Sequence, residues 1–289
     1  MKRKEFIRKS LAGSIGLGIG VKTLAETSNS EAVNLDPKVQ VGFNHIKTME
    51  TKTSTTVLHK ADSRGDANHG WLHSRHSFSF ANYYNPERMN FGVLRVLNDD
   101  IVAPGMGFGT HPHSNMEIIS IPLAGDLEHK DSMGTTSVIK QGDIQVMSAG
   151  TGIYHSEYNA NKDKEVKFLQ IWVIPNEENV SPRYDQISIK ELATPNQFNQ
   201  VLSPNDDDDG VWIHQDAWFH IGQFDQSTEQ AYQIHREGNG VYAFMLDGEA
   251  EIAGQALESR DGFGIWDVDN FNIKAKAGAR ILLMEVPMN

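Results

Sequence analysis

Short runs of apolar and β-branched residues recur along the chain from Val57 onward, separated by turn residues such as Gly, Asn and Asp. Runs of this length and spacing predict β-strands. Segments with a 3.6-residue apolar period are almost absent, which favours a sandwich or barrel of strands over a helical fold. The triplet Asn98, Asp99 and Asp100 is one of the predicted breaks between strands. The strands expected in the first series cover residues 90–97, 117–123, 136–140, 144–147 and 166–174.

A second series of strand-like runs begins at Val211 and has a similar size and rhythm. This repetition predicts an all-β chain built from two β-barrel domains, an N-terminal one over residues 53–175 and a C-terminal one over 211–289. Residues 176–210, rich in Pro, Asn and Gln, are expected to connect them, with a strand or short helix over 186–193. The strands expected in the second series cover residues 211–214, 218–224, 240–246, 249–252, 264–266, 271–275 and 279–286.

The first 25 residues have the pattern of a bacterial export signal. A basic head, residues 1–9, precedes an apolar, Gly-rich run, residues 10–21, and small residues follow up to Ala25. Arg3 and Lys4 resemble a twin-arginine motif in which the second Arg is Lys, and an ordinary secretory signal is the alternative. We therefore expect an exported, periplasmic protein if the signal is used and a cytoplasmic one otherwise. Residues 26–52 are polar and weakly patterned, and we expect them to form a flexible lead-in.

Composition narrows the classes of function. The chain of 289 residues contains no cysteine, which excludes disulfides, cysteine nucleophiles and thiolate metal sites. Its formal net charge of −12 disfavours nucleic acid as a partner. No stretch has the roughly 18 to 20 apolar residues that a membrane-spanning helix requires.

Two pairs of polar residues indicate a metal site. His111 and His113 are two residues apart, and His155 and Glu157 repeat this spacing in a second Gly-rich segment. Alternate residues of a strand share a face, so each pair can point into one cavity. Three imidazoles and a carboxylate suit one divalent transition metal, and Fe(II), Mn, Ni, Co, Cu and Zn all remain open on this pattern.

The other histidines are each expected to be surface or hydrogen-bonded core residues. The second half has only His235 in its Gly-rich hairpin region, without a partner pair, so we expect no metal there. The histidines assigned to a structural role by default are His45, His59, His129, His214 and His220.

The segments around these ligands resemble the pirin family. The similarity is carried by residues 107–113, 129–134 and 149–157, and it is dense from about residue 61 to 175. Upstream, residues 70–80 and 88–96 look like the bacterial, quercetinase-like branch, and the second half resembles the quercetinase-type C-terminal cupin. The residues Gly105, His111, His113, Glu117 and Gly125 nearly match the first cupin motif, with one extra residue before the last glycine.

The resemblance implies a bicupin, that is, two jelly-roll barrels with one metal in the N-terminal barrel. It implies His111, His113, His155 and Glu157 as the ligands, and Fe(II) as the expected ion. Glu117, a ligand in many cupins, is then expected near the site as a second layer or as barrel filling.

The implied activity is that of a quercetin 2,3-dioxygenase, which opens a flavonol with O₂ and releases carbon monoxide. Glu157 is placed to remove the proton of the flavonol 3-hydroxyl as a general base. Phe78, Phe80 and Phe108 are candidates for the walls of the substrate slot, although ordinary core packing explains each of them equally well. Second-layer contributions from His73, His76 and Asp143 stay open.

Two alternatives to a dioxygenase remain at the level of sequence. One is a non-catalytic, redox-responsive metal protein that acts through a protein partner, in the manner of eukaryotic pirins; an export signal disfavours it. The other is a cupin isomerase or sugar-modifying enzyme in which His and Tyr work without metal; the paired ligand spacing disfavours it. For the dioxygenase, the expected partners are a flavonol-like aromatic substrate and O₂.

Overall fold

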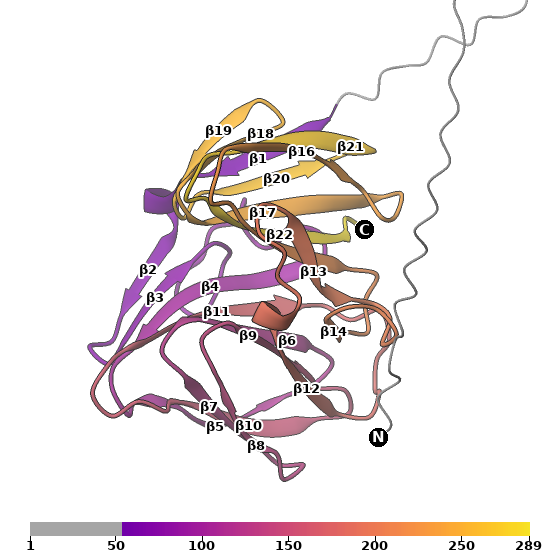
Figure 1. The fold of residues 1–289 in the computed structure, drawn as a ribbon. Coiled ribbons are helices and arrows are strands. Elements are labelled where there is room, and N and C mark those ends of the chain that lie inside the picture. The colour runs from indigo at the N-terminus through magenta and orange to yellow at the C-terminus, as the bar shows by residue number, and fades with distance from the viewer. Residues whose placement is uncertain (1–53) are drawn as a thin grey trace, which may run out of the picture. The chain divides into compact units, whose positions relative to one another are not determined.

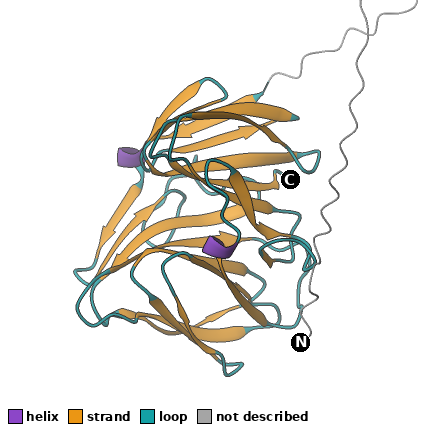
Figure 2. Cartoon of the chain, viewed as in Figure 1, coloured by secondary structure: helices purple, strands orange, loops and turns teal. Residues whose placement is uncertain are grey.

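The computed structural model describes residues 54–289, in which almost all regular elements are strands (Figures 1 and 2). The predicted export signal (1–25), most of the predicted lead-in (26–52) and His45 lie outside the described residues, as does the rest of 1–53. Four sheets make up the described part, in two pairs that each combine a seven-stranded and a four-stranded sheet. This repetition confirms the all-β prediction and the two cupin-like domains.

The N-terminal sheet pair consists of a seven-stranded sheet in the order β12-β9-β6-β11-β4-β3-β2 and a four-stranded sheet in the order β5-β10-β7-β8. All of its neighbouring strands are antiparallel. Its strands are β2 (Gly65–Asn68), β3 (Leu72–His76), β4 (Leu94–Val102), β5 (Gly107–His113), β6 (Glu117–Ala124), β7 (Leu127–Asp131), β8 (Thr136–Ile139), β9 (Asp143–Ser148), β10 (Ile153–Asn159), β11 (Val166–Val173) and β12 (Arg183–Ser188).

The C-terminal sheet pair repeats this arrangement, with the orders β1-β20-β17-β22-β15-β13-β14 and β16-β21-β18-β19. Two short 3-10 helices, η1 (Ala61–Ser63) and η2 (Ile189–Glu191), complete the described elements. The strands of this pair are β1 (Thr55–His59), β13 (Phe198–Ser203), β14 (Val211–Trp212), β15 (Trp218–Gln223), β16 (Thr228–Gln233), β17 (Asn239–Asp247), β18 (Glu249–Ile252), β19 (Gln255–Glu258), β20 (Gly262–Trp266), β21 (Asn270–Ala275) and β22 (Arg280–Pro287).

Three strands belong to sheets outside the predicted bounds of their segments, although β12 and η2 overlap the strand or short helix expected over 186–193. The segment β1 falls inside the predicted N-terminal domain, yet it pairs with β20 of the C-terminal sheet pair. The predicted connection, 176–210, contains β12, which pairs with β9, and β13, which pairs with β15. Every residue of β12 is half-buried, so this strand lacks the alternation of apolar and polar residues that reveals a strand in a sequence.

The strand β4 also differs from its prediction, because it continues through the triplet that was expected to break it. Asn98 and Asp100 are 2% and 3% exposed, and their side chains lie on the inner face of the N-terminal sheet pair. Buried polar side chains in mid-strand look like a turn in a sequence, although here they line a cavity.

The two sheet pairs have different interiors, and a separate apolar core lies between them. One cluster joins the two seven-stranded sheets and combines residues such as Ile119 and Ile171 with Phe219 and Met284. A second, continuous apolar cluster fills the C-terminal sheet pair. The interior of the N-terminal sheet pair holds two smaller apolar clusters instead.

A row of polar residues crosses the inner face of the N-terminal seven-stranded sheet. Its members are neighbours in register on five adjacent strands, and all are buried, so this interior is built around polar groups rather than an apolar core. In order across the sheet they are His76, Asn98, Gln170, Ser120 and Gln145.

Candidate metal centre

The two predicted ligand pairs lie on adjacent strands. His111 of β5 is the register partner of His155 of β10, and His113 is the partner of Ile153. The register shifts between His155 and Glu157, where β5 has one residue more than β10, so a bulge of β5 lies beside the site. The structure therefore brings together the three histidines that the i, i+2 spacing singles out.

The three imidazoles converge closely. The Nε2 atoms of His111 and His155 are 3.0 Å apart, and each of the three histidines offers one nitrogen within 4.8 Å of the others. Two nitrogens bound to one ion at about 2.1 Å and a right angle would have a separation of this size. His111 donates from Nδ1 to the carbonyl oxygen of Gly109 at 2.8 Å, which leaves its Nε2 free to accept.

Burial keeps two of the three imidazoles, His113 and His155, in the neutral form that binds metals. Burial and the neighbouring His111 and His113 lower the pKa of His155 to about 2. Burial and His111 lower the pKa of His113 to about 4. Neutral imidazoles are the species that coordinate a metal, so this donor set fits a divalent transition metal ion.

Glu157 lies beside the histidines, 2% exposed, on the inner side of β10. Its two oxygens accept hydrogen bonds from the Ser120 hydroxyl, at 2.9 Å, and the Gln170 amide, at 2.6 Å. Burial raises its pKa to about 7, and these two hydrogen bonds act in the opposite direction. A carboxyl group that exchanges its proton near neutral pH can serve as a general base.

His129 is a member of this cluster that the sequence reading assigned to a structural role. It is fully buried on β7, opposite Glu157, and together with His155 and Glu157 it forms a second group whose ligand atoms lie within 4.8 Å of one another. Its Nε2 is 3.1 Å from Asp131, whereas its Nδ1 has no hydrogen-bond partner among the described residues. Alternate residues of β7 share its inner face, and these are Leu127, His129 and Asp131. This spacing is the signal in the sequence that places His129 and the carboxylate of Asp131 on that face.

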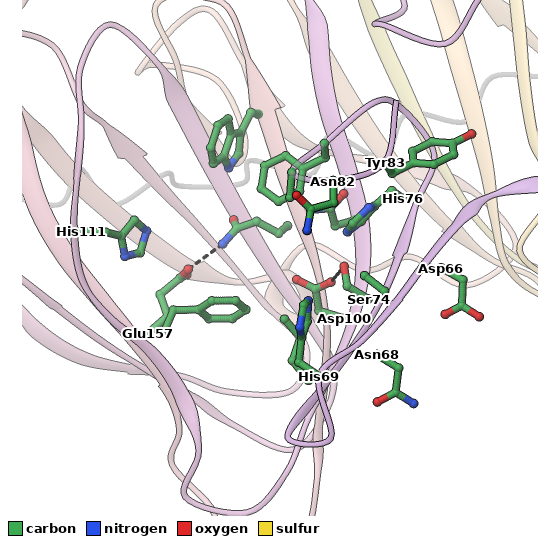
Figure 3. A pocket seen from close by; sticks show the side chains of 18 of the residues that line it. Asp66, Asn68, His69, Ser74, His76, Asn82, Tyr83, Asp100, His111 and Glu157 are labelled. Atoms are coloured by element: carbon green, nitrogen blue, oxygen red, sulfur yellow. Dashed lines mark hydrogen bonds between the residues drawn. The ribbon is translucent and has the colours of Figure 1, made fainter. Parts of the chain in front are cut away.

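A cavity of about 590 Å³ opens from this cluster (Figure 3). It has a size that suits a small organic ligand. His111, His113 and Glu157 lie at one end, and Phe80, Phe108 and Trp172 contribute aromatic surface to its walls.

Comparison with known proteins matches both halves of the chain. The family model described as Pirin matches residues 57–173, and the model described as Quercetinase C-terminal cupin domain matches residues 200–286. Quercetin 2,3-dioxygenase of Escherichia coli strain K12 is 42% identical over 230 residues, which are 80% of this chain and 98% of that protein. A pirin-like protein of Caulobacter vibrioides is 37% identical over 78% of this chain and 96% of that protein.

The chain belongs to the pirin family.

Solved pirin structures agree with this assignment. The crystal structure of the bacterial pirin YhhW of Escherichia coli in complex with nickel(II) has a TM-score of 0.76 at 40% sequence identity, over 81% of this chain and 99% of that chain. A quercetin 2,3-dioxygenase from Acinetobacter baumannii, with a TM-score of 0.64 at 18% identity, shares the fold. The nickel complex and the histidine cluster together support a divalent metal site in this pirin.

Glu117 occupies a different place in this pirin from the one expected. It lies on the same face of β6 as Ile119 and Ile121, towards the core between the two sheet pairs, whereas Ser120 faces Glu157. Its carboxylate accepts a hydrogen bond from Ser148 at 2.7 Å. The strand alternation therefore directs Glu117 away from the histidines, and this position corrects the expectation of a second-layer role.

Other expected neighbours of the site divide into two groups. His76 lines the cavity, as do Phe80 and Phe108, whereas Phe78 packs against Tyr242 in the core. The remaining residues, His73 and Asp143, bond elsewhere, His73 to Asp66 and Asp143 to the backbone N–H of Lys140.

One histidine of the C-terminal sheet pair, His235, bonds to a carboxylate. His235 Nδ1 is 2.7 Å from buried Glu285, which also accepts from Tyr232, and the ring of His220 stacks on that of His235. Both groups of side chains in residues 54–289 whose geometry could hold a metal ion belong to the N-terminal sheet pair. Over the same residues, no helix has the length and apolar character needed to cross a membrane.

Proposed function

We propose that this chain is a metal-dependent dioxygenase that cleaves flavonols such as quercetin by 2,3-dioxygenation, with release of carbon monoxide. The observation that carries the proposal is the convergence of three imidazoles and the buried Glu157 carboxyl at one end of an aromatic-walled cavity. Relatives named quercetin 2,3-dioxygenase support this activity and favour it over a non-catalytic role.

In this proposal, His111, His113, His155 and Glu157 hold one divalent ion. When bound, the ion supplies Lewis acidity and a template for substrate and dioxygen. Fe(II) is the ion that we propose, and the nickel complex of a related pirin makes Ni(II) the first alternative. Mn, Co, Cu and Zn are compatible with the same donor set.

Glu157 also removes the proton of the flavonol 3-hydroxyl. The Ser120 hydroxyl and the Gln170 amide donate to its two oxygens, which fixes the orientation of the carboxyl and stabilises its charged form. Because burial raises the pKa of Glu157 to about 7, both protonation states are accessible at neutral pH. The aromatic side chains of Phe80, Phe108 and Trp172 confine a flat substrate beside it.

The test is oxygen uptake with quercetin after separate reconstitution with Fe(II), Mn, Ni, Co and Cu. We expect uptake with at least one metal and its loss in Glu157→Gln of verified metal content. The matched control is Glu117→Gln, which changes a buried glutamate on the opposite face of the sheet and is expected to retain uptake. Stoichiometric metal without uptake under any of these conditions would refute the proposed activity.

We also propose that the protein is exported to the periplasm. The support is the basic head and apolar run within residues 1–25. Sequencing of the mature N-terminus from a bacterial host tests this proposal, because a mature chain that still begins at Met1 contradicts it.

A further inference from the structure

In residues 54–289, the cavity lining contains acidic side chains that are not balanced by Lys or Arg. Its carboxylates are Asp66, Asp100 and Glu157, and among the described residues that line it there is no Lys or Arg. A carboxylate or phosphate group on a ligand would therefore meet no cationic side chain outside the metal cluster. The three carboxyl groups accept hydrogen bonds when charged, so the lining suits a neutral ligand that carries donors, such as a phenol.

Asp100 is the acceptor that the mechanism leaves unused. It is 3% exposed in the middle of β4, and the Ser74 hydroxyl donates to its Oδ1. No described residue donates to its Oδ2, and no Lys or Arg pairs with it. Because a buried carboxyl without a cationic partner is costly, it is not explained by stability. Consistent with this, burial raises the pKa of Asp100 to about 7.

Two neighbours of Asp100 share this lack of partners. The Oδ1 atom of Asn98 and the Nδ1 atom of His76 are buried, and neither has a hydrogen-bond partner in the described part of the chain. Asn98 and His76 are 2% exposed, lie next to each other in register and line the same cavity. Polar groups with spare bonding capacity thus gather at one wall of the cavity.

The position of this wall relative to the metal cluster is visible in Figure 3. His111 and Glu157 lie on one side of the view, Asp66 and Asn68 lie on the other, and Asp100 and Ser74 lie between them. A ligand with one end at Glu157 that extends towards the hairpin of β2 and β3 therefore passes Asp100.

We infer that Asp100, oriented by Ser74, is a specificity-determining residue that accepts a hydrogen bond from a peripheral hydroxyl group of the substrate, remote from the group held at Glu157. This inference rests on the proposed function and narrows it to phenols with a second hydroxylated region. Above its raised pKa the Asp100 carboxyl is charged, and a hydrogen bond to a charged acceptor contributes about a tenfold or larger preference for a ligand that carries the hydroxyl.

The test compares the binding of two flavonols to full-length protein loaded with redox-inert Zn(II), without oxygen. Quercetin carries peripheral hydroxyls, and 3-hydroxyflavone has none besides the 3-hydroxyl. Quenching of tryptophan fluorescence reports binding, since Trp172 lines the cavity. Wild-type protein is expected to bind quercetin at least about tenfold more tightly than 3-hydroxyflavone.

In Asp100→Asn, quercetin affinity should fall about tenfold while 3-hydroxyflavone affinity stays the same, because only quercetin offers the hydroxyl. Ser74→Ala, which keeps the carboxylate but not its orienting hydroxyl, should shift quercetin affinity in the same direction by a smaller factor. The matched control, Asp99→Asn, changes the adjacent carboxylate of β4, which pairs with Arg64, does not line the cavity and should alter neither affinity.

An unchanged preference in Asp100→Asn, or an equal loss for both flavonols, would overturn the inference. Oxygen uptake by the same variants with a redox-active metal separates this failure from that of the proposed function. If quercetin is turned over but its preferred binding does not depend on Asp100, only the inference about Asp100 is refuted. If the preferred binding depends on Asp100 but no turnover occurs, only the proposed dioxygenase activity is refuted. If neither flavonol binds, both are refuted.

Discussion

Glu157 is held by two neutral donors rather than by a cation, so its ability to act at the metal site depends on Ser120 and Gln170. We expect Ser120→Ala to weaken divalent metal binding by about tenfold, because groups that orient a ligand contribute 10- to 100-fold to metal affinity. Competition with a chromogenic chelator measures the change. Ser148→Ala is the control, since its hydroxyl bonds to Glu117 on the opposite face of the sheet; equal losses in both variants would contradict the argument.

Glu117 makes the stability of the protein depend on pH. Burial raises its pKa from 4.5 to about 7, with the Ser148 hydrogen bond acting in the opposite direction. The folded chain therefore keeps a proton that the unfolded chain releases between these values, so the free energy of unfolding falls as pH rises through this window. In Glu117→Gln, we expect that fall to be smaller by about 1–3 kcal/mol. Urea denaturation at pH 5 and pH 8 tests this, and parallel changes in the two proteins would count against it.

The residues of the site differ in how well the sequence predicts their positions. The i, i+2 pairs His111/His113 and His155/Glu157 predict the histidine convergence because a strand puts alternate residues on one face. Asp100 could not be found in this way, since three consecutive polar residues indicate a turn unless the cavity that they line is known. His129 is a hydrogen-bonded core residue, as expected, but its place beside His155 and Glu157 depends on the pairing of β7 with β10, which a lone histidine in a sequence does not indicate.

At the scale of elements, Phe91 joins the two sheet pairs by packing against β17 and β20. Its ring lies beside Tyr242 and Trp266, and both strands have a glycine at the contact, Gly240 and Gly264. A Cβ on Gly264 would lie 2.5 Å from the Phe91 ring and 2.8 Å from Val57.

We therefore expect Gly264→Ala to lower the free energy of unfolding by about 1–3 kcal/mol through overpacking. In a Phe91→Ala background the penalty should be smaller, because the ring that the new methyl group meets is absent. Denaturant titration of the four proteins completes the cycle. Additive effects would show that Phe91 is not what excludes a side chain at position 264.

The elements that the sequence predicts well are those with a buried apolar face of their own. The predicted strands 117–123 and 166–174 coincide closely with β6 and β11, which lie in the middle of a sheet and are almost wholly buried. The strand β1 has a mostly exposed side, and its partner β20 follows it by some 200 residues, so local patterning contains no information about their pairing.

At the scale of the whole molecule, the two sheet pairs share one apolar core, formed by the facing seven-stranded sheets. Loss of either sheet would expose the core residues of the other, such as Ile171 of β11 or Met284 of β22. The candidate metal site belongs to the N-terminal sheet pair alone, yet this shared core couples the C-terminal sheet pair to it.

We therefore expect metal binding to stabilise both sheet pairs in a single unfolding transition. At a free metal concentration of 100 times the dissociation constant, the gain should be about 2.7 kcal/mol. Thermal unfolding with and without metal, together with amide hydrogen exchange in β17 of the C-terminal sheet pair, measures this coupling. His113→Ala should abolish the metal-dependent shift, and His214→Ala, a histidine outside the cluster, should retain it. Two separate transitions, of which only one responds to metal, would show that the shared core does not make the sheet pairs unfold together.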